Sequence, residues 1–138
     1  MAIKGLEIRN DGIVHENEDR MVFEVFNDDN SDKDKFLARN VRAFIVKRNG
    51  WIADHYRDDW EYYCVLAGEA HWFFEDMKTR ERERHVVKAG GKVKIPPNVA
   101  HSLKVKKGTI VLGRYFKPFQ ELKTNKYVLE WARGEAGN

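Results

Sequence analysis

The sequence predicts an all-β fold, with antiparallel strands that close into a barrel or pair as two packed sheets. Short runs rich in β-branched and aromatic residues recur along the 138-residue chain. Turn-forming pairs such as Asn49-Gly50, Gly90-Gly91 and Lys107-Gly108 separate these runs. A strand-rich chain of this length removes its exposed edges by closing or pairing its sheets.

The strands are expected at regular intervals along most of the chain. We place them at residues 21–27, 41–47, 51–56, 61–67, 70–75, 84–88, 92–95, 101–105 and 109–116. Residues 28–35 read as an exposed acidic loop, and the charged run 75–84 as a hairpin tip. Beyond residue 116, we expect a short C-terminal helix or arm over 120–133 that packs on the barrel, followed by a frayed end at 134–138.

Length and composition favour one soluble domain over residues 1–138. No apolar run approaches the ~18 residues of a membrane span, and the first residues lack signal-peptide features. We therefore expect a cytoplasmic protein that does not contact membranes.

The net charge of +3 arises from basic and acidic residues that alternate, so nucleic acid is not an expected partner. The single cysteine, Cys64, is expected to be a buried thiol.

Two segments place glycine and histidine residues at distinctive spacings, and the first segment also contains a glutamate. The first contains Gly50, His55, Arg57, Glu61 and Gly68, and the second contains Gly90, Pro96, Asn98, His101 and Val105. These residues resemble the two motifs of the cupin family, G-x5-H-x-H-x3-4-E-x6-G and G-x5-P-x-G-x2-H-x3-N, with one residue fewer before the first histidine. The resemblance covers residues 41–116 and implies a double-stranded β-helix, the cupin jelly-roll barrel.

Three positions depart from the cupin motifs. Asn98 replaces a glycine, which is tolerable because asparagine also adopts left-handed backbone conformations. Val105 stands where the second motif ends in asparagine. Arg57 replaces the second histidine of the first motif, and this change bears directly on function because a guanidinium cannot ligate a metal.

Strand alternation gives a separate reason to group the candidate residues. Alternate side chains share one face of a strand, so His55 should point the same way as Arg57, and Glu61 the same way as Tyr63. If these faces line the barrel, His101 can join them from a third strand. We therefore predict one interior site formed by both motifs.

A metal centre is one interpretation of this site. Two imidazoles and a carboxylate, from His55, His101 and Glu61, form a ligand set that suits a divalent iron, manganese, zinc or nickel ion and leaves positions open. The alternative is that no metal is bound, because Arg57 adds a fixed positive charge beside the ligands. On the metal interpretation the protein is a dioxygenase or lyase of the cupin type.

A second resemblance favours metal-free chemistry. Residues 21–27, 46–57, 94–101 and 116–118 are similar to segments of the sugar-nucleotide epimerases and ketoisomerases within the cupin superfamily. That resemblance implies that His55 removes a proton next to a carbonyl and that a tyrosine returns one. Tyr63 is assigned as this acid, with Tyr115 as the alternative and as a substrate contact. Arg57 is expected to hold the charge of a small anionic carbohydrate.

Some residues have simpler interpretations, and one further function remains open. His71 and His85 lack motif partners and are read as structural or surface residues, and the aromatic residues as core. A cupin barrel can also bind a small molecule without turning it over. The family resemblance implies a homodimer that pairs through outer strands.

Overall fold

The computed structural model describes residues 2–10, 13–25 and 40–136. The predicted acidic loop at 28–35 and the end of the predicted strand 21–27 lie outside these residues. Among the described residues, no helix is long and apolar enough to cross a membrane. Cys64 is buried with a free thiol, as predicted.

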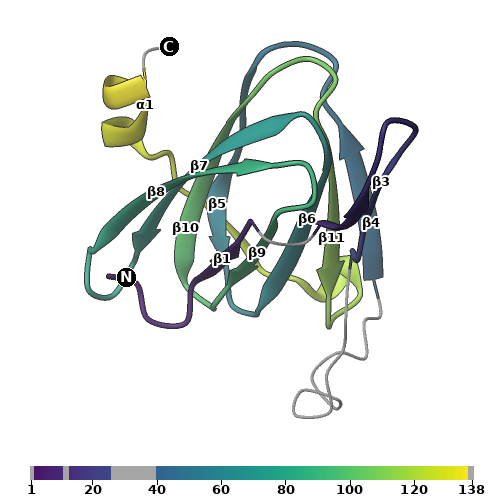
Figure 1. Ribbon diagram of the computed structural model, residues 1–138. Helices are drawn as coiled ribbons and strands as arrows, with labels where there is room; N and C mark the ends of the chain where they lie inside the picture. Colours follow the sequence, from purple (N-terminus) through teal and green to yellow (C-terminus); the bar gives the residue numbers. More distant parts are fainter. Residues whose placement is uncertain (1, 11–12, 26–39, 137–138) are drawn as a thin grey trace.

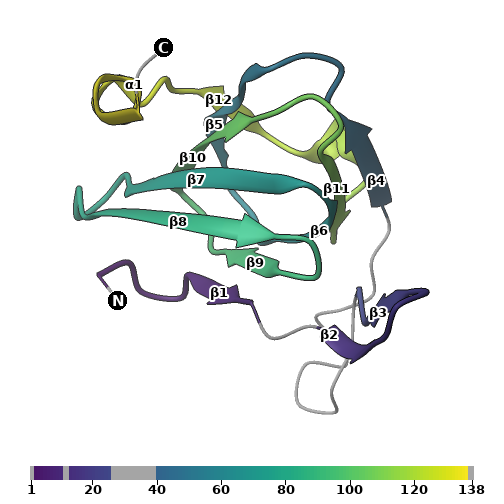
Figure 2. The ribbon, with the colours of Figure 1, turned by 45° about the horizontal axis from the view of Figure 1, so that its top comes forward.

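Two five-stranded antiparallel sheets face each other and form the barrel (Figures 1 and 2). The first sheet has the order β1 (Glu7–Arg9), β9 (Lys92–Ile95), β6 (Glu61–Ala67), β11 (Ile110–Tyr115) and β4 (Asn40–Ile45). The second has the order β12 (Thr124–Lys126), β5 (Gly50–Arg57), β10 (Val99–Val105), β7 (Glu69–Asp76) and β8 (Arg82–Lys88). A separate hairpin joins β2 (Ile13–Glu16) and β3 (Met21–Phe23).

The observed architecture confirms the predicted all-β jelly roll. Every predicted strand from residue 41 onward has a counterpart that differs by at most a few residues at its ends. The short strands β1, β2 and β12 were not predicted. The chain ends in the 3-10 helix η2 (Phe119–Glu121), β12 and the helix α1 (Glu130–Ala136). The expected helix or arm over 120–133 is confirmed in part, since the helix begins only at Glu130; residues 134–136, expected to be frayed, are helical, and residues 137 and 138 lie outside the described residues.

The apolar core lies between the two sheets, and a smaller cluster lies outside them. Val65, Val93 and Leu103 are among the residues buried in the interior, beside the stacked rings of Trp72 and Phe74. Burial of such side chains contributes roughly 1.5–3 kcal/mol each. On the outer face of the second sheet, Leu129 and Ala132 from the C-terminal segment pack against Phe73 and Ala100. The C-terminal helix is therefore attached to the sheet that carries β5 and β10.

Candidate functional site

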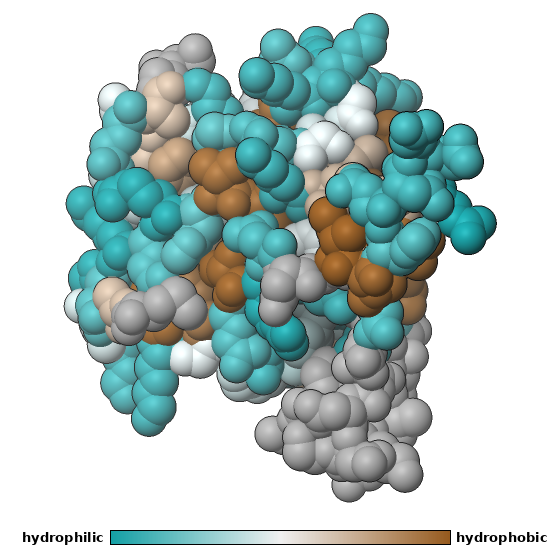
Figure 3. Space-filling view, viewed as in Figure 1, coloured by the Kyte–Doolittle hydropathy of each residue, from teal (hydrophilic) through white to brown (hydrophobic). Residues whose placement is uncertain are grey.

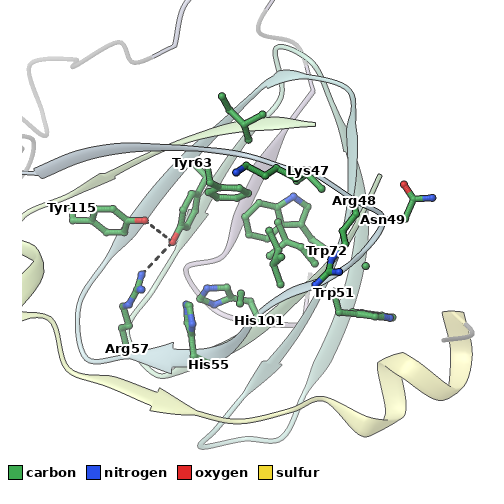
Figure 4. A pocket seen from close by; sticks show the side chains of 17 residues that line it. Lys47, Arg48, Asn49, Trp51, His55, Arg57, Tyr63, Trp72, His101 and Tyr115 are labelled. Atoms are coloured by element: carbon green, nitrogen blue, oxygen red, sulfur yellow. Dashed lines mark hydrogen bonds between the residues drawn. The ribbon is translucent and has the colours of Figure 1, made fainter. Parts of the chain in front are cut away.

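A cavity of about 590 Å³ opens between the sheets (Figure 4). His55 and Arg57 on β5, Tyr63 on β6, His101 on β10 and Tyr115 on β11 point into one region of it. The loop between β4 and β5 forms its rim. The predicted convergence of the two motifs is confirmed, since one potential ligand atom from each of His55, Glu61 and His101 lies within 4.8 Å of the others.

A bulge in β5 turns His55 into this cavity. Ile52 pairs with Leu103 and His55 pairs with His101, so two residues of β5 stand opposite one residue of β10. The two residues, Ala53 and Asp54, have φ values of 75° and 57°. Regular alternation from Ile52 would have turned His55 outward. His55 and Arg57 share one face, as predicted from the sequence, but the bulge on which this orientation depends was not predicted.

Backbone hydrogen bonds orient both imidazoles. The Nδ1 atom of His101 lies 3.1 Å from the carbonyl oxygen of Val99, and this ring nitrogen must be the donor because a carbonyl only accepts. His55 makes a corresponding backbone hydrogen bond to Ala53. Within the described residues, the buried Nε2 atoms of both rings have no hydrogen-bond partner. The rings meet edge to face with their centroids 4.7 Å apart.

The surroundings of His55 keep its imidazole neutral. Burial, followed by the coulombic effects of His101 and Arg57, lowers the pKa of His55 from 6.5 to about 3, and Asp54 opposes this shift only in part. The lone pair on Nε2 is therefore available at physiological pH. A neutral imidazole with an unpaired nitrogen can accept a proton or ligate a metal.

Glu61 is almost fully buried and receives hydrogen bonds from two neighbours. Its Oε1 accepts from Nη1 of Arg57 at 2.5 Å and from the hydroxyl of Tyr63 at 2.7 Å. Its Oε2 lies 3.6 Å from Nε2 of His101. Arg57 also donates from Nε to the hydroxyl of Thr124 at 3.1 Å. From the sequence, Arg57 was expected to contact substrate, and its ion pair with Glu61, which offsets the cost of a buried carboxylate, was not predicted.

Two tyrosines continue the network from Glu61. The hydroxyl of Tyr115 donates to that of Tyr63 across 3.1 Å (Figure 4). Burial raises the pKa of Tyr63 well above its usual value and also raises the pKa of Tyr115, so both phenols stay protonated. A Cβ atom on Gly113 would lie 2.6 Å from the Tyr115 hydroxyl and 2.9 Å from Cε1 of Tyr63. Glycine at 113 therefore makes room for the tyrosine pair.

Two basic side chains at the rim were not singled out from the sequence. Lys47 and Arg48 are exposed and line the cavity where β4 leads into β5. Among the described residues that line the cavity, Lys47, Arg48 and Arg57 are the ones with a lysine or arginine side chain, and none has a carboxylate. The one sequence signal of Lys47 and Arg48 is the position directly before the Asn49-Gly50 turn. The cavity is thus suited to an anionic ligand.

The remaining histidines that the sequence analysis set aside lie elsewhere. Nε2 of His71 lies 3.0 Å from Glu69, and Nε2 of His85 lies 2.8 Å from Glu83. Neither residue lines the cavity with His55. Their interpretation as structural or surface residues is consistent with this placement.

No protein-family model matches the chain, and no curated protein sequence matches it. Solved structures do match. One is ChmJ, a 3'-monoepimerase from Streptomyces bikiniensis, in complex with dTDP-quinovose, with a TM-score of 0.73 and 13% identity over 86% of this chain and 67% of that chain. The chain has the cupin fold.

Two further cupin structures show the same likeness. The dTDP-6-deoxy-D-glucose-3,5-epimerase RmlC from Legionella pneumophila, in complex with dTDP-4-keto-L-rhamnose, has a TM-score of 0.68 and 16% identity over 85% of this chain and 69% of that one. The TDP-quinovose 3,4-ketoisomerase WlaRB from Campylobacter jejuni has a TM-score of 0.67 and 18% identity over 89% of this chain and 95% of that one. The cupin expected from the two motifs is thus confirmed at the level of fold.

Proposed function

We propose that this protein is a sugar-nucleotide epimerase or ketoisomerase that moves a proton on a carbon next to a carbonyl. The observation that carries the proposal is the neutral imidazole of His55, whose Nε2 has no hydrogen-bond partner among the described residues and lies in a cavity with three cationic lining residues. A nucleotide-linked sugar supplies the complementary negative charge on its diphosphate. Structures with the same fold are named as epimerases and ketoisomerases of such sugars.

His55 is the base in the proposed reaction. Its Nε2 takes the proton from the carbon beside the ketone, and the electron pair of the broken C–H bond moves to the carbonyl oxygen to give an enolate. The negative charges of enolate and diphosphate raise the pKa of the neighbouring imidazole, since an opposite charge favours the protonated form. Arg57 adds a positive charge that stabilises the enolate. The low pKa that His55 has without a neighbouring anion is therefore compatible with its role as a base.

Tyr63 is the acid in this scheme. Its hydroxyl gives a proton to carbon, and the hydrogen bond from Tyr115 provides a route by which that proton is replaced. Return of the proton to the opposite face of the same carbon gives an epimer. Protonation of the other enolate carbon moves the ketone. At the rim, Lys47 and Arg48 hold the diphosphate by charge-assisted hydrogen bonds.

Solvent exchange tests the proposed base directly. We expect the wild-type protein to incorporate deuterium from D2O into dTDP-4-keto-L-rhamnose at carbons next to the ketone, followed by NMR and mass spectrometry. His55→Asn should slow this exchange by about 100-fold or more, because a positioned general base contributes about 10² to 10⁴ in rate. His71→Asn, which alters a histidine outside the cavity, is the matched control and should exchange at the wild-type rate.

The exchange experiment also separates the alternatives. Wild-type exchange in folded His55→Asn would refute the role of His55. Binding of the nucleotide sugar by the wild-type protein without exchange at any carbon would instead support the non-catalytic binding function.

A metal-dependent function is a second candidate, favoured by a specific arrangement of donors. One nitrogen of each ring and one carboxylate oxygen lie within 4.8 Å of one another, and among the described residues neither Nε2 has a hydrogen-bond partner. Arg57 occupies Oε1 of Glu61, so His55, His101 and Oε2 of Glu61 would hold the ion. A bound iron, manganese, zinc or nickel ion would act as a Lewis acid or redox centre.

Elemental analysis tests this second candidate. If the site takes a metal, chelator-treated protein reloaded separately with Fe²⁺, Mn²⁺, Zn²⁺ or Ni²⁺ should retain close to one equivalent of one of them. Glu61→Gln should lose that metal, because an amide is a much weaker ligand than a carboxylate. Sub-stoichiometric retention of all four metals by the wild-type protein, or equal retention by the variant, would refute the site.

We further propose that the protein forms a homodimer through the edge strand β4 and works in the cytoplasm. β4 is the outermost strand of its sheet among the described residues, and Val41 and Ile45 on it are 55% and 66% exposed. Figure 3 shows hydrophobic side chains on the side of the molecule where Figure 1 shows β3 and β4. An exposed apolar edge of this kind is suited to pairing with a second copy.

A further inference from the structure

An ion-pair cluster lies directly behind His55, outside the cavity. Arg133 on α1 donates from Nη1 and Nη2 to the two carboxylate oxygens of Asp54, at 3.0 and 2.9 Å. Ser102 on β10 donates its hydroxyl to Oδ1 of Asp54 at 2.7 Å. The pair is only partly exposed, at 22% for Arg133 and 17% for Asp54. Nothing in the proposed chemistry uses these three residues.

The cluster contacts β5 at the two residues whose backbone conformation is unfavourable for a residue with a side chain. Ala53 and Asp54 both have positive φ, at 75° and 57°, and neither is a glycine. Side chains make this region costly, so it persists only where surrounding contacts hold it. Besides the contacts to its carboxylate, Asp54 accepts a backbone hydrogen bond from Tyr127 at 2.8 Å. The bulge is thus held by the C-terminal segment and β10.

Loss of the bulge would reverse the side chains that follow it. With the extra residue, Ile52 and His55 both face inward opposite Leu103 and His101. Without it, a regular strand from Ile52 would turn Asp54 inward and His55 outward, because the side-chain period of a strand is two. The contacts of Asp54 therefore select the register that places an imidazole in the cavity.

We propose that Arg133 is a positioning residue, which holds the β5 bulge through Asp54 and so keeps the His55 imidazole inside the cavity. Its importance for catalysis rests on the proposed function, whereas its effect on the orientation of His55 does not. Arg133 also lies over the ring of Trp51 at 4.9 Å, so the same guanidinium contacts β5 before the bulge as well as within it. The helix itself is anchored independently, since Leu129 and Ala132 are fully buried.

The test compares three variants with the wild-type protein. Arg133→Gln removes the paired donors while the apolar anchors of α1 remain. Ala53→Gly combined with Arg133→Gln removes the cost of positive φ at one bulge residue, because glycine adopts this conformation readily. Glu135→Gln is the matched control, since Glu135 lies on the same helix in an exposed 2.7 Å ion pair with Arg84, away from His55.

The readout is the nuclear Overhauser effect between the His55 and His101 ring protons, whose rings are 4.7 Å apart, on chelator-treated protein without substrate. We expect Arg133→Gln to reduce this signal at least twofold, the glycine double variant to restore it, and Glu135→Gln to leave it unchanged. In the deuterium-exchange assay, kcat should fall for Arg133→Gln with little change in KM, because the rim residues that hold the diphosphate are untouched.

Two results would overturn the proposal. An unchanged ring-to-ring signal in Arg133→Gln would show that the bulge stands without the ion pair. A reduced signal that Ala53→Gly does not restore would show that Arg133 acts by some route other than the bulge. A failure of the proposed function is distinguishable, because absence of exchange in the wild-type protein would leave the ring-to-ring signal and its response to Arg133→Gln intact.

Discussion

At the scale of single residues, Arg57 determines how the polar groups of the cavity are paired. Its guanidinium contacts the buried carboxylate of Glu61, so the interior holds a compensated ion pair. Removal of Arg57 would leave Glu61 as an uncompensated buried charge, which is strongly destabilising. A substitution at 57 therefore cannot separate substrate binding from folding. Lys47 and Arg48 are better positions at which to test anion binding, because both are exposed.

The shifted pKa of His55 predicts a specific acid sensitivity. The pKa is about 3 in the folded protein and 6.5 for an unperturbed histidine, so the unfolded state binds more protons between these values. Stability contributed by neutral His55 is complete above pH 6.5 and is lost as the pH falls toward 3. Between pH 6.5 and 4.5 the loss is at most about 2.7 kcal/mol, from 1.36 kcal/mol per pKa unit.

Urea denaturation of chelator-treated protein at these two pH values measures this loss. His55→Asn removes the titrating group, so its free energy of unfolding should fall less on acidification than that of the wild-type protein. Both proteins contain the same carboxylates. The difference between their losses of unfolding free energy from pH 6.5 to 4.5 therefore reports the titration of His55. An equal loss of unfolding free energy in both proteins would mean that His55 is not buried as a neutral ring.

Residues whose requirements are local could be predicted from the sequence. Asn98 was expected to tolerate a left-handed conformation at a motif glycine, and its φ is 64°. His55, Glu61 and His101 were grouped through motif spacing. The ion pair between Arg57 and Glu61 was missed because it depends on how a long side chain folds back within the barrel. Lys47 and Arg48 were missed because two basic residues before a turn are normally a solvated surface.

At the scale of elements, strand alternation predicted β6 better than β5. Tyr63 and Val65, two residues apart on β6, both belong to the interior cluster, as a regular strand requires. On β5 the alternation breaks at Ala53 and Asp54. A bulge often carries a glycine as its signal, and neither residue is one, so nothing local in the sequence marks it. The bulge is specified instead by Arg133, about 80 residues away in the chain.

The strands that escaped prediction are the shortest ones. β1 and β12 have three residues each and β2 has four, which is too few for an alternating pattern to stand out. One of them has a definite role beside the site. β12 pairs with β5 and brings Thr124 opposite Arg57, where its hydroxyl accepts the guanidinium hydrogen bond. Pairing in three dimensions, and not local pattern, makes these segments strands.

At the scale of the whole molecule, the barrel combines an apolar core with a polar cavity between the same two sheets. Motif spacing was sufficient to predict the fold and the convergence of the site. It could not decide between a metal centre and a metal-free base, because the same three side chains serve both and the contacts of Arg57 are long-range. The basic rim adds information that only the assembled barrel gives, namely the sign of charge that a ligand meets.

Association of two barrels is the property to test at this scale. Val41 projects from the edge strand β4 and is 55% exposed, so Val41→Asp should place repelling, hydrated charges at the proposed interface. We expect sedimentation velocity to show a wild-type dimer and at least a tenfold weaker association for the variant. Val86→Asp is the matched control, because Val86 is 44% exposed on β8 of the other sheet. A monomeric wild-type protein, or equal weakening by both substitutions, would exclude β4 as the dimer edge.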